Sequence, residues 1–203
     1  MNRGKIDYNL QSPGQSGPSM HMLQRLLEFD RKISSKLILP AENKALRASA
    51  SFFAHSGDSW FWLAGLFLIW LFSRGQTHTL SALFAGAIAL QAALVLAIKF
   101  KVKRKRPEGE WGAVYRNIDP HSFPSGHAVR AVMIALLAWG LGWQPWAFLL
   151  LVWAILVSLA RVSLGVHYLS DVLAGWALGA LLAWGVPAAQ PFLYKWFPFI
   201  FFN

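Results

Sequence analysis

Long apolar segments constrain this chain more than any other feature. Residues 80–100 form an uninterrupted apolar run in which the only charged residue is Lys99, near its end. About 20 apolar residues in a helix cross the hydrocarbon core of a bilayer, so this run predicts a transmembrane helix. We expect four further spans, over residues 60–72, 127–142, 145–160 and 167–186. The first is short for a bilayer, and the last contains Gly175 and Gly179 in a G-x-x-x-G spacing that permits close helix approach.

The composition agrees with a membrane protein. Of the 203 residues, 56% are hydrophobic and only 14% are charged, which is unusually apolar for a soluble domain. Eleven tryptophans fit a chain whose amphipathic rings lie at two membrane interfaces. We therefore predict an all-α fold: a polytopic membrane helix bundle with about five transmembrane helices, formed by one membrane-embedded domain over residues 21–203.

The segments before the first span differ in character. Residues 1–20 are polar and rich in Gly, Pro and Ser, which predicts a disordered lead and no cleavable signal peptide. In residues 22–39, apolar side chains recur every three or four positions with charges between them. This pattern favours an amphipathic helix lying on the membrane surface. Residues 41–58 predict a second interfacial helix, ending near Gly57.

The formal charge of +10 raises the question of an anionic partner. Nucleic acid is one such partner, but the cations fall between apolar runs, where lipid head groups or phosphate are nearer at hand. We therefore expect the lipid bilayer and a membrane lipid as partners, and no nucleic acid. The chain has no cysteine, which excludes disulfides and thiolate metal sites. Nothing in the sequence sets an oligomeric state.

A basic segment follows the span at residues 80–100. Lys99 and Arg106 are seven residues apart, close to two helical turns, and Pro107 follows immediately. Both cations would share a face if the helix continued to this point, and the proline would end it. We interpret Lys101, Lys103, Arg104 and Lys105 as a juxtamembrane cluster that holds anionic lipid.

A second group, Pro124-Ser125-Gly126-His127, stands at the head of an apolar run. Serine is a favoured N-cap residue, and the free N–H groups of a helix start bind anions, with Gly126 allowing a close approach. His127 would then lie near enough to a bound phosphate to exchange a proton with it. The alternative is a capped helix with an interfacial histidine. Arg130, one turn further on, receives no role.

A third group contains Arg161, His167 and Asp171. On a helix, His167 and Asp171 are four residues apart and share a face. A carboxylate beside an imidazole fixes its tautomer and stabilises its charged form, which leaves the other ring nitrogen as a candidate nucleophile. An aspartate within a membrane helix also points to function. The alternative is a structural hydrogen bond between His167 and Asp171.

Together, the three groups resemble the type 2 phosphatidic acid phosphatase family, membrane lipid phosphatases related to vanadium haloperoxidases. The family pattern is K-x6-R-P, then P-S-G-H, then S-R-x5-H-x3-D. It is matched here by Lys99, Arg106 and Pro107, by residues 124–127, and by Arg161, His167 and Asp171. The serine that the pattern has before the arginine is Ala160 in this chain. Many members have six spans; here interfacial helices take the place of the first.

The resemblance implies a reaction and a set of roles. His167 attacks phosphorus to form a phosphohistidine, Asp171 orients it, and His127 protonates the leaving oxygen and then activates water. The implied phosphate-binding groups are Lys99, Arg106, Ser125, Gly126 and Arg161. Clustered positive charge of this kind serves phosphoryl transfer without a metal. We therefore expect a metal-independent hydrolase with no cofactor.

The expected substrate is a lipid phosphate or diphosphate, of the undecaprenyl diphosphate, phosphatidate or phosphatidylglycerol phosphate type. Two alternatives stay open: a lipid phosphotransferase, and a non-catalytic lipid-binding or scramblase-like membrane protein. We expect a multi-pass protein of the cell (inner) membrane. The density of Lys and Arg on the active-site side predicts a cytoplasmic site, whereas the resemblance to bacterial enzymes favours the outer, periplasmic face, which we adopt.

Overall fold

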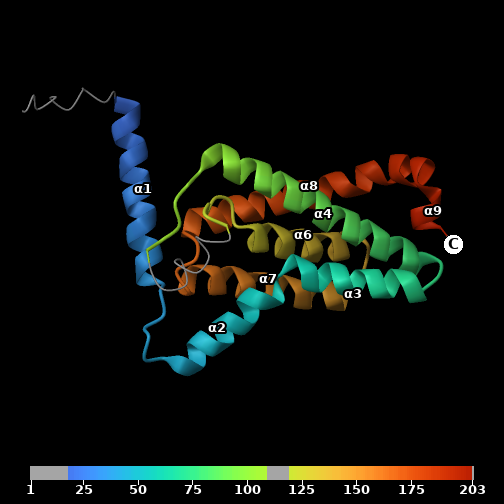
Figure 1. Ribbon diagram of the computed structural model, residues 1–203, viewed down its shortest axis with the longest axis horizontal. Coiled ribbons are helices and arrows are strands. Elements are labelled where there is room, and N and C mark those ends of the chain that lie inside the picture. The colour runs from blue at the N-terminus through green and yellow to red at the C-terminus, as the bar shows by residue number, and fades with distance from the viewer. Residues whose placement is uncertain (1–17, 109–118, 203) are drawn as a thin grey trace, which may run out of the picture.

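The computed structural model describes residues 18–108 and 119–202 of the chain. The described residues form eight helices and no strand (Figure 1). In chain order these are α1 (Pro18–Lys36), α2 (Lys44–Ser56), α3 (Ser59–Phe72), α4 (Gln76–Val102), α6 (Gly126–Gly140), α7 (Gln144–Ser163), α8 (Leu169–Trp196) and α9 (Pro198–Phe201). The predicted all-α class is confirmed.

Helix α6 forms the centre of the bundle, and α7 and α8 make its main contacts. Ten of its side chains, from Ala128 to Ala138, are buried. The predicted close approach at the G-x-x-x-G spacing is confirmed. A Cβ atom on Gly179 would lie 2.5 Å from the carbonyl oxygen of Val129, and one on Gly175 would lie 3.0 Å from that of Ser125. The two glycines therefore let the backbone of α8 lie directly against the start of α6.

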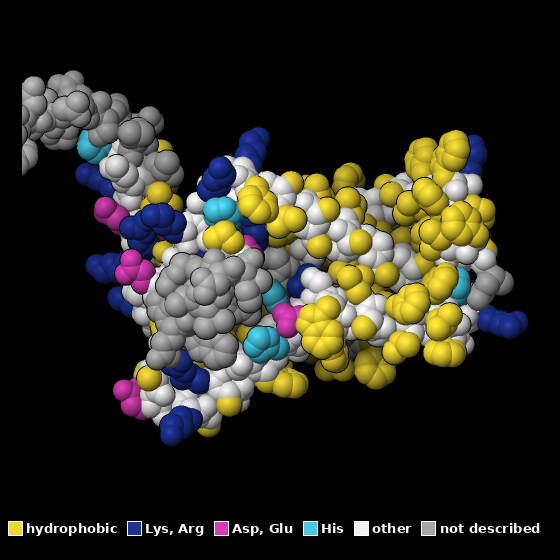
Figure 2. All heavy atoms as spheres, viewed as in Figure 1, with side chains coloured by type: hydrophobic (Ala, Val, Ile, Leu, Met, Phe, Trp, Pro, Cys, Tyr) yellow, Lys and Arg dark blue, Asp and Glu magenta, His cyan; other side chains and the backbone are white. Residues whose placement is uncertain are grey.

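Each of the five apolar segments predicted to span the membrane forms a helix over most of its length. Helices α4, α7 and α8 are long and apolar enough to cross a membrane. Helices α3 and α6 have 14 and 15 residues, so at about 1.5 Å per residue they fall short of a full hydrocarbon core. For these two helices, crossing stays a prediction. On the face that Figure 2 shows, apolar side chains cover much of the bundle away from α1, as lipid contact would require.

Two helices precede the bundle, as the sequence predicts. Helix α1 lies across one end of the bundle and α2 leads obliquely into it (Figure 1). The side chain of Asn43 accepts a hydrogen bond from the Leu46 N–H and so caps α2, which explains why that helix begins there. Helix α1 begins at Pro18, three residues before the predicted domain boundary. The rest of the predicted lead, residues 1–17, lies outside the described residues.

The C-terminal segment departs from the predicted boundary. The last span was expected to end near Val186, yet α8 continues through Pro187 and Pro191 to Trp196. A proline costs a helix one backbone hydrogen bond, and neighbouring helices in a bundle can satisfy the groups this frees. The short α9 then folds back, and its Ile200 carbonyl accepts a hydrogen bond from the Trp70 indole at 2.8 Å. These contacts close the end of the bundle opposite α1.

Candidate active site

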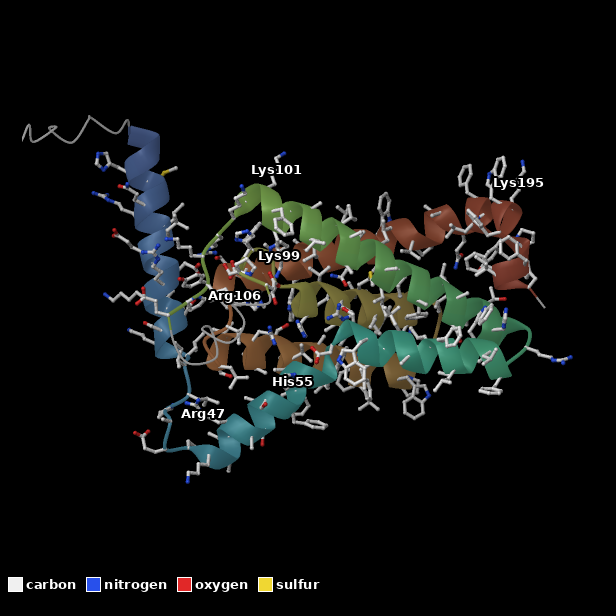
Figure 3. All side chains as sticks on the ribbon, in the orientation of Figure 1. Arg47, His55, Lys99, Lys101, Arg106 and Lys195 are labelled. Carbon is white, nitrogen blue, oxygen red and sulfur yellow. The ribbon has the colours of Figure 1, made fainter. Side chains whose placement is uncertain are left out.

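The three motif segments meet at the end of the bundle that α1 covers. Backbone contacts tie them together. An isolated bridge pairs Lys105 with His121, the Ser122 N–H donates to the Arg104 carbonyl at 2.8 Å, and the Ser125 N–H donates to the Asp171 carbonyl at 3.0 Å. The loop after α4, the loop before α6 and the first turn of α8 are thus linked. The labelled side chains of Lys99 and Arg106 lie together there, while Lys101 points away and Lys195 lies at the far end (Figure 3).

Lys99 and Arg106 are buried and share one carboxylate, that of Asp119. The Lys99 ammonium and the Arg106 guanidinium both donate to Asp119 Oδ2, the guanidinium at 2.9 Å. Burial by itself raises the pKa of the Asp119 carboxyl, but Lys99 and Arg106 outweigh it and hold that pKa below its ordinary value. Sequence reasoning missed Asp119. It occupies the position of an anion between two cations, where a phosphoryl oxygen would find the same donors.

His167 lies beside these cations in a fully buried position. The Arg106 Nη1 atom is 3.1 Å from His167 Nε2, and since arginine only donates, Nε2 accepts and the ring proton belongs on Nδ1. Burial, followed by the charges of Arg161, Arg106 and Lys99, lowers the pKa of His167 well below its ordinary value. The imidazole is therefore neutral at neutral pH. Its Nε2 has the lone pair that a nucleophile needs.

The predicted reason for the His167–Asp171 pairing is wrong, although the two residues are adjacent. His167 lies before α8, which begins at Leu169 with Tyr168 as its N-cap, so the pair does not share a helix face. Asp171 is the third residue of the helix and folds back over its start, where its Oδ2 accepts from the Tyr168 N–H at 2.9 Å. The same oxygen is 3.5 Å from His167 Nδ1, which has no hydrogen-bond partner among the described residues.

Arg104 also departs from its predicted role. Its guanidinium donates to Asp171 Oδ1 at 2.7 Å and to Asp30 Oδ2 at 2.6 Å, and it stacks over the Tyr168 ring at 4.2 Å. These contacts link α1 to the start of α8 and hold the carboxylate beside His167. Arg104 is therefore an interior connection, not part of a lipid-holding cluster. A basic run alone gave no signal that one member turns inward.

The start of α6 carries the second motif. Ser125 occupies the predicted N-cap position, but its side chain makes no capping bond. Its Oγ is buried and has no hydrogen-bond partner within residues 18–108 and 119–202. Gly126 begins the helix, so its N–H belongs to the first turn, where backbone donors lack intrahelical acceptors. A free hydroxyl and free N–H groups together suit an oxyanion.

His127 is held by a residue that the motifs do not include. Its Nε2 lies 2.7 Å from Asp58 Oδ1, and Asp58 precedes α3 in the turn after α2. Arg161, which is fully buried, acts electrostatically on both His127 and His167. The eight predicted site residues therefore gather at one end of the bundle. No sequence signal pointed to Asp58, because 69 residues separate it from its partner.

A cavity of about 1160 Å³ opens beside this cluster. Its wall includes Arg106 and His167 from the motif segments, Lys103 and Lys105 from the loop after α4, and Arg31 from α1. The cavity therefore joins the buried histidine and arginine to more exposed cations. Figure 2 shows Lys and Arg side chains gathered around α1 and α2 at this end of the molecule. Such a space suits a multiply charged anionic head group.

Comparison with known proteins shows the family to which the chain belongs. The family model described as PAP2 superfamily matches residues 80–195, which contain all three motif segments. A decaprenylphosphoryl-5-phosphoribose phosphatase of Mycobacterium tuberculosis is 37% identical over 145 residues, covering 68% of this chain and 77% of the relative. An undecaprenyl-diphosphatase of Sulfolobus acidocaldarius is 30% identical over 157 residues, covering 73% of this chain and 72% of the relative.

A solved structure gives the same result for the fold. The crystal structure of a transmembrane PAP2-type phosphatidylglycerolphosphate phosphatase from Bacillus subtilis superposes with a TM-score of 0.67 and 26% sequence identity. The match covers 85% of this chain and 89% of that one. The match to the family model extends over more than half of the chain and includes both histidines and all three motif cations. This chain is a member of the PAP2 superfamily.

Proposed function

We propose that this protein is an integral-membrane lipid phosphatase that hydrolyses a lipid phosphate or diphosphate through a phosphohistidine intermediate. The observation that carries the proposal is the position of His167. Its Nε2 is an acceptor 3.1 Å from Arg106, in a buried cluster with Lys99 and Arg161. A neutral imidazole surrounded by fixed cations is an arrangement for attacking a phosphoryl group.

In the first step, His167 Nε2 attacks phosphorus and the bond from phosphorus to the leaving oxygen breaks. This oxygen is the ester oxygen of a lipid phosphate or the bridging oxygen of a diphosphate. The leaving oxygen takes a proton from His127. Lys99, Arg106 and Arg161 bind the equatorial oxygens, together with the Ser125 hydroxyl and the Gly126 N–H. The phosphoryl group displaces the Asp119 carboxylate from Lys99 and Arg106, since both anions need the same donors. Asp171 Oδ2, 3.5 Å from the protonated Nδ1 of His167, stabilises the positive charge that forms on the ring.

In the second step, His127 removes a proton from water. The water oxygen attacks phosphorus, and the bond between phosphorus and His167 Nε2 breaks to release inorganic phosphate. We propose that no metal ion takes part, because phosphoryl transfer chiefly needs positive charge around the equatorial oxygens. Three buried cations and the first turn of α6 supply that charge.

The size and charge of the cavity favour a head group larger than a single phosphate. Arg31, Lys103 and Lys105 line it beyond Arg106, and a second phosphate or a phosphosugar would reach them. Two relatives are named for lipids of this kind, a decaprenylphosphoryl-phosphoribose and undecaprenyl diphosphate. We therefore place polyprenyl lipids with two phosphate groups first among the candidate substrates, ahead of phosphatidate and phosphatidylglycerol phosphate.

We propose that the site opens at the outer face of the cell membrane. The chain has no cysteine, so a single introduced cysteine is the only residue that a maleimide labels. Its labelling shows on which side of the membrane that position lies. Glu42→Cys lies at the site end and Arg74→Cys at the far end, and both positions are exposed. A membrane-impermeant maleimide added to intact cells should label only Glu42→Cys. Labelling of Arg74→Cys alone would place the site in the cytoplasm.

Phosphate release from purified protein in detergent tests the function. The panel contains undecaprenyl diphosphate, phosphatidate and phosphatidylglycerol phosphate, each with EDTA present and with His167→Ala as the control. We expect EDTA-resistant hydrolysis that the substitution abolishes. Loss of activity in EDTA with recovery in magnesium would overturn the metal-free mechanism. Transfer of labelled phosphate to a second lipid in place of water would identify a phosphotransferase, and lipid movement that survives His167→Ala would identify a scramblase.

A further inference from the structure

The turn between α2 and α3 is a fourth chain segment at the active site. Asp58 lies in this turn, and its Oδ1 is 2.7 Å from His127 Nε2. Its other oxygen, Oδ2, is 3.3 Å from His55 Nδ1. Gly57 lies against the edge of the His127 ring, where an added Cβ would be 3.1 Å from the ring Cδ2. The turn therefore contacts the imidazole both through a carboxylate and through backbone that has no side chain.

Three other helices fix the position of this turn. Arg130 of α6 donates from Nε to the Gly57 carbonyl at 2.8 Å and from Nη1 to the Ser59 hydroxyl at 2.5 Å. The Trp62 indole of α3 donates to the Ser56 carbonyl at 3.0 Å, and the Trp153 indole of α7 donates to the Ser56 hydroxyl at 2.9 Å. Asp58 is thus flanked by anchored residues on both sides, which gives its carboxylate one defined place. Arg130, unassigned from the sequence, serves this purpose.

The hydrogen bond from His127 to Asp58 decides which ring nitrogen is free. An ionised carboxylate only accepts, so Nε2 donates its proton to Asp58. Burial raises the pKa of the Asp58 carboxyl, but its interactions with His127 and His55 outweigh burial and lower that pKa to about 2. Asp58 is therefore ionised at any working pH. His127 is left with Nδ1 as the nitrogen that exchanges a proton with another molecule.

We propose that Asp58 is the positioning residue of the acid–base histidine: it fixes the proton of His127 on Nε2, directs Nδ1 to the substrate, and stabilises the charged ring. This role rests on the phosphatase function proposed above. Within residues 18–108 and 119–202, the charged groups acting on His127 besides Asp58 are the cations Arg161 of α7 and Arg130 of its own helix. Both disfavour a charged imidazole, so the carboxylate is the group that offsets them when His127 holds its second proton.

Two substrates with different leaving groups test the role of Asp58, because the substrate that needs no protonation serves as a reference for the one that does. Phosphatidate loses an alkoxide that requires protonation, whereas p-nitrophenyl phosphate loses a phenolate that departs without it. The ratio kcat/KM includes steps only up to the first product release, so the later hydrolysis of the phosphoenzyme does not enter. The variants are Asp58→Asn, Asp58→Glu and, as the matched control, Glu42→Gln, which neutralises an exposed carboxylate in the loop between α1 and α2.

We expect Asp58→Asn to lower kcat/KM for phosphatidate by about 100-fold and to leave p-nitrophenyl phosphate within a few-fold of wild type. The alkaline limb of the pH profile should move to lower pH, because the acid form of His127 loses its counter-charge. Asp58→Glu should recover part of the loss and Glu42→Gln should match wild type. The comparison between substrates is independent of how much of a variant is folded, since both are measured on the same preparation.

Two results would overturn the proposal. An equal loss for both substrates would make Asp58 a structural residue only, and so would an alkaline limb that stays in place. If the wild-type protein hydrolysed neither substrate nor the lipids of the panel, the phosphatase function itself would fail and the role of Asp58 with it. If the wild-type protein is active and Asp58→Asn lowers kcat/KM equally for both substrates, the positioning role of Asp58 is wrong and the phosphatase function stands.

Discussion

The two histidines at the site each have a carboxylate, but the two pairs are built differently. Asp171 follows His167 by four residues, is fully buried, and lies 3.5 Å from the ring. Its oxygens are shared with Arg104 and the Tyr168 N–H. Asp58 is 69 residues from His127, is 22% exposed, and lies 2.7 Å from it. Local spacing therefore brought together the looser pair, and tertiary packing brought together the closer one.

This difference follows from what each carboxylate must do for the fold. Asp171 folds back over the start of α8 and balances the charge of Arg104, so His167 is one of several groups competing for it. In the part of the chain that the structure describes, the carboxylate of Asp58 forms hydrogen bonds with two imidazoles, those of His127 and His55. The two histidines also hold their protons on opposite nitrogens: Nε2 is the unprotonated nitrogen of His167, and Nδ1 is that of His127. We infer that a nucleophile and a proton carrier differ here by tautomer as well as by position.

The largest effects should come from removing either ring. His167→Ala should lower kcat/KM by about 10⁴-fold or more, and His127→Ala by about 10² to 10⁴-fold. Only His127→Ala should still trap labelled phosphate on the protein from p-nitrophenyl phosphate after rapid quenching, because attack needs His167 alone. A trapped label in His167→Ala and none in His127→Ala would reverse the two roles.

Neutralising Asp171 and neutralising Asp58 should lower the free energy of unfolding by different amounts. Asp171→Asn removes the fully buried one of the two carboxylates that pair with Arg104 and should cost about 3 kcal/mol of unfolding free energy besides activity. Asp58→Asn should change stability by about 1 kcal/mol or less, because the lost pair is partly exposed. Thermal unfolding followed by tryptophan fluorescence in detergent measures both. Equal destabilisation by the two variants would remove the structural contrast between the pairs.

Removing the side chain of Arg104, which pairs with Asp171, should have a smaller effect. Arg104→Ala removes the contacts to Asp171 and Asp30, so we expect about a 10-fold loss of kcat/KM. Lys101→Ala is the matched control, because Lys101 lies three residues earlier in the same basic run and points away from the site (Figure 3). Phosphate release in detergent should leave this control near wild type. Similar losses of kcat/KM in both variants would mean that Arg104 acts only as one member of the basic cluster, as the sequence predicted.

The smallest effect should come from the glycine beside His127. Gly57→Ala places a Cβ 3.1 Å from the His127 ring and 3.2 Å from Val157, so the ring must shift by a few tenths of an ångström. We expect a loss of a few-fold for alkyl phosphates and less for p-nitrophenyl phosphate. Gly86→Ala is the control, since its Cβ meets nothing within 4 Å. No difference between the two alanine variants would mean that the ring tolerates displacement from Asp58.

Much of the site was predictable because the motif residues are close in sequence to helix boundaries. Alternating apolar spans put the segments around Lys99, Ser125 and His167 at one end of the bundle, and the structure has them there. Other features were not predictable. Asp119, Arg104 and Arg130 look like ordinary charged residues of loops and helix ends. Their partners come from helices and loops that are distant in the sequence or outside any helix, and no spacing within one helix indicates them.

The sequence by itself determined the apolar helices, their order and the end at which the motif residues meet, because hydropathy and helix period are local properties of the chain. Tertiary structure alone decided that Asp58 faces His127, that Arg104 turns inward to Asp171, and that α8 continues through two prolines. Those outcomes depend on which helix surfaces pack together, as where Gly175 and Gly179 admit the backbone of α6. A buried charge then takes the partner that packing places beside it, wherever that partner lies in the sequence.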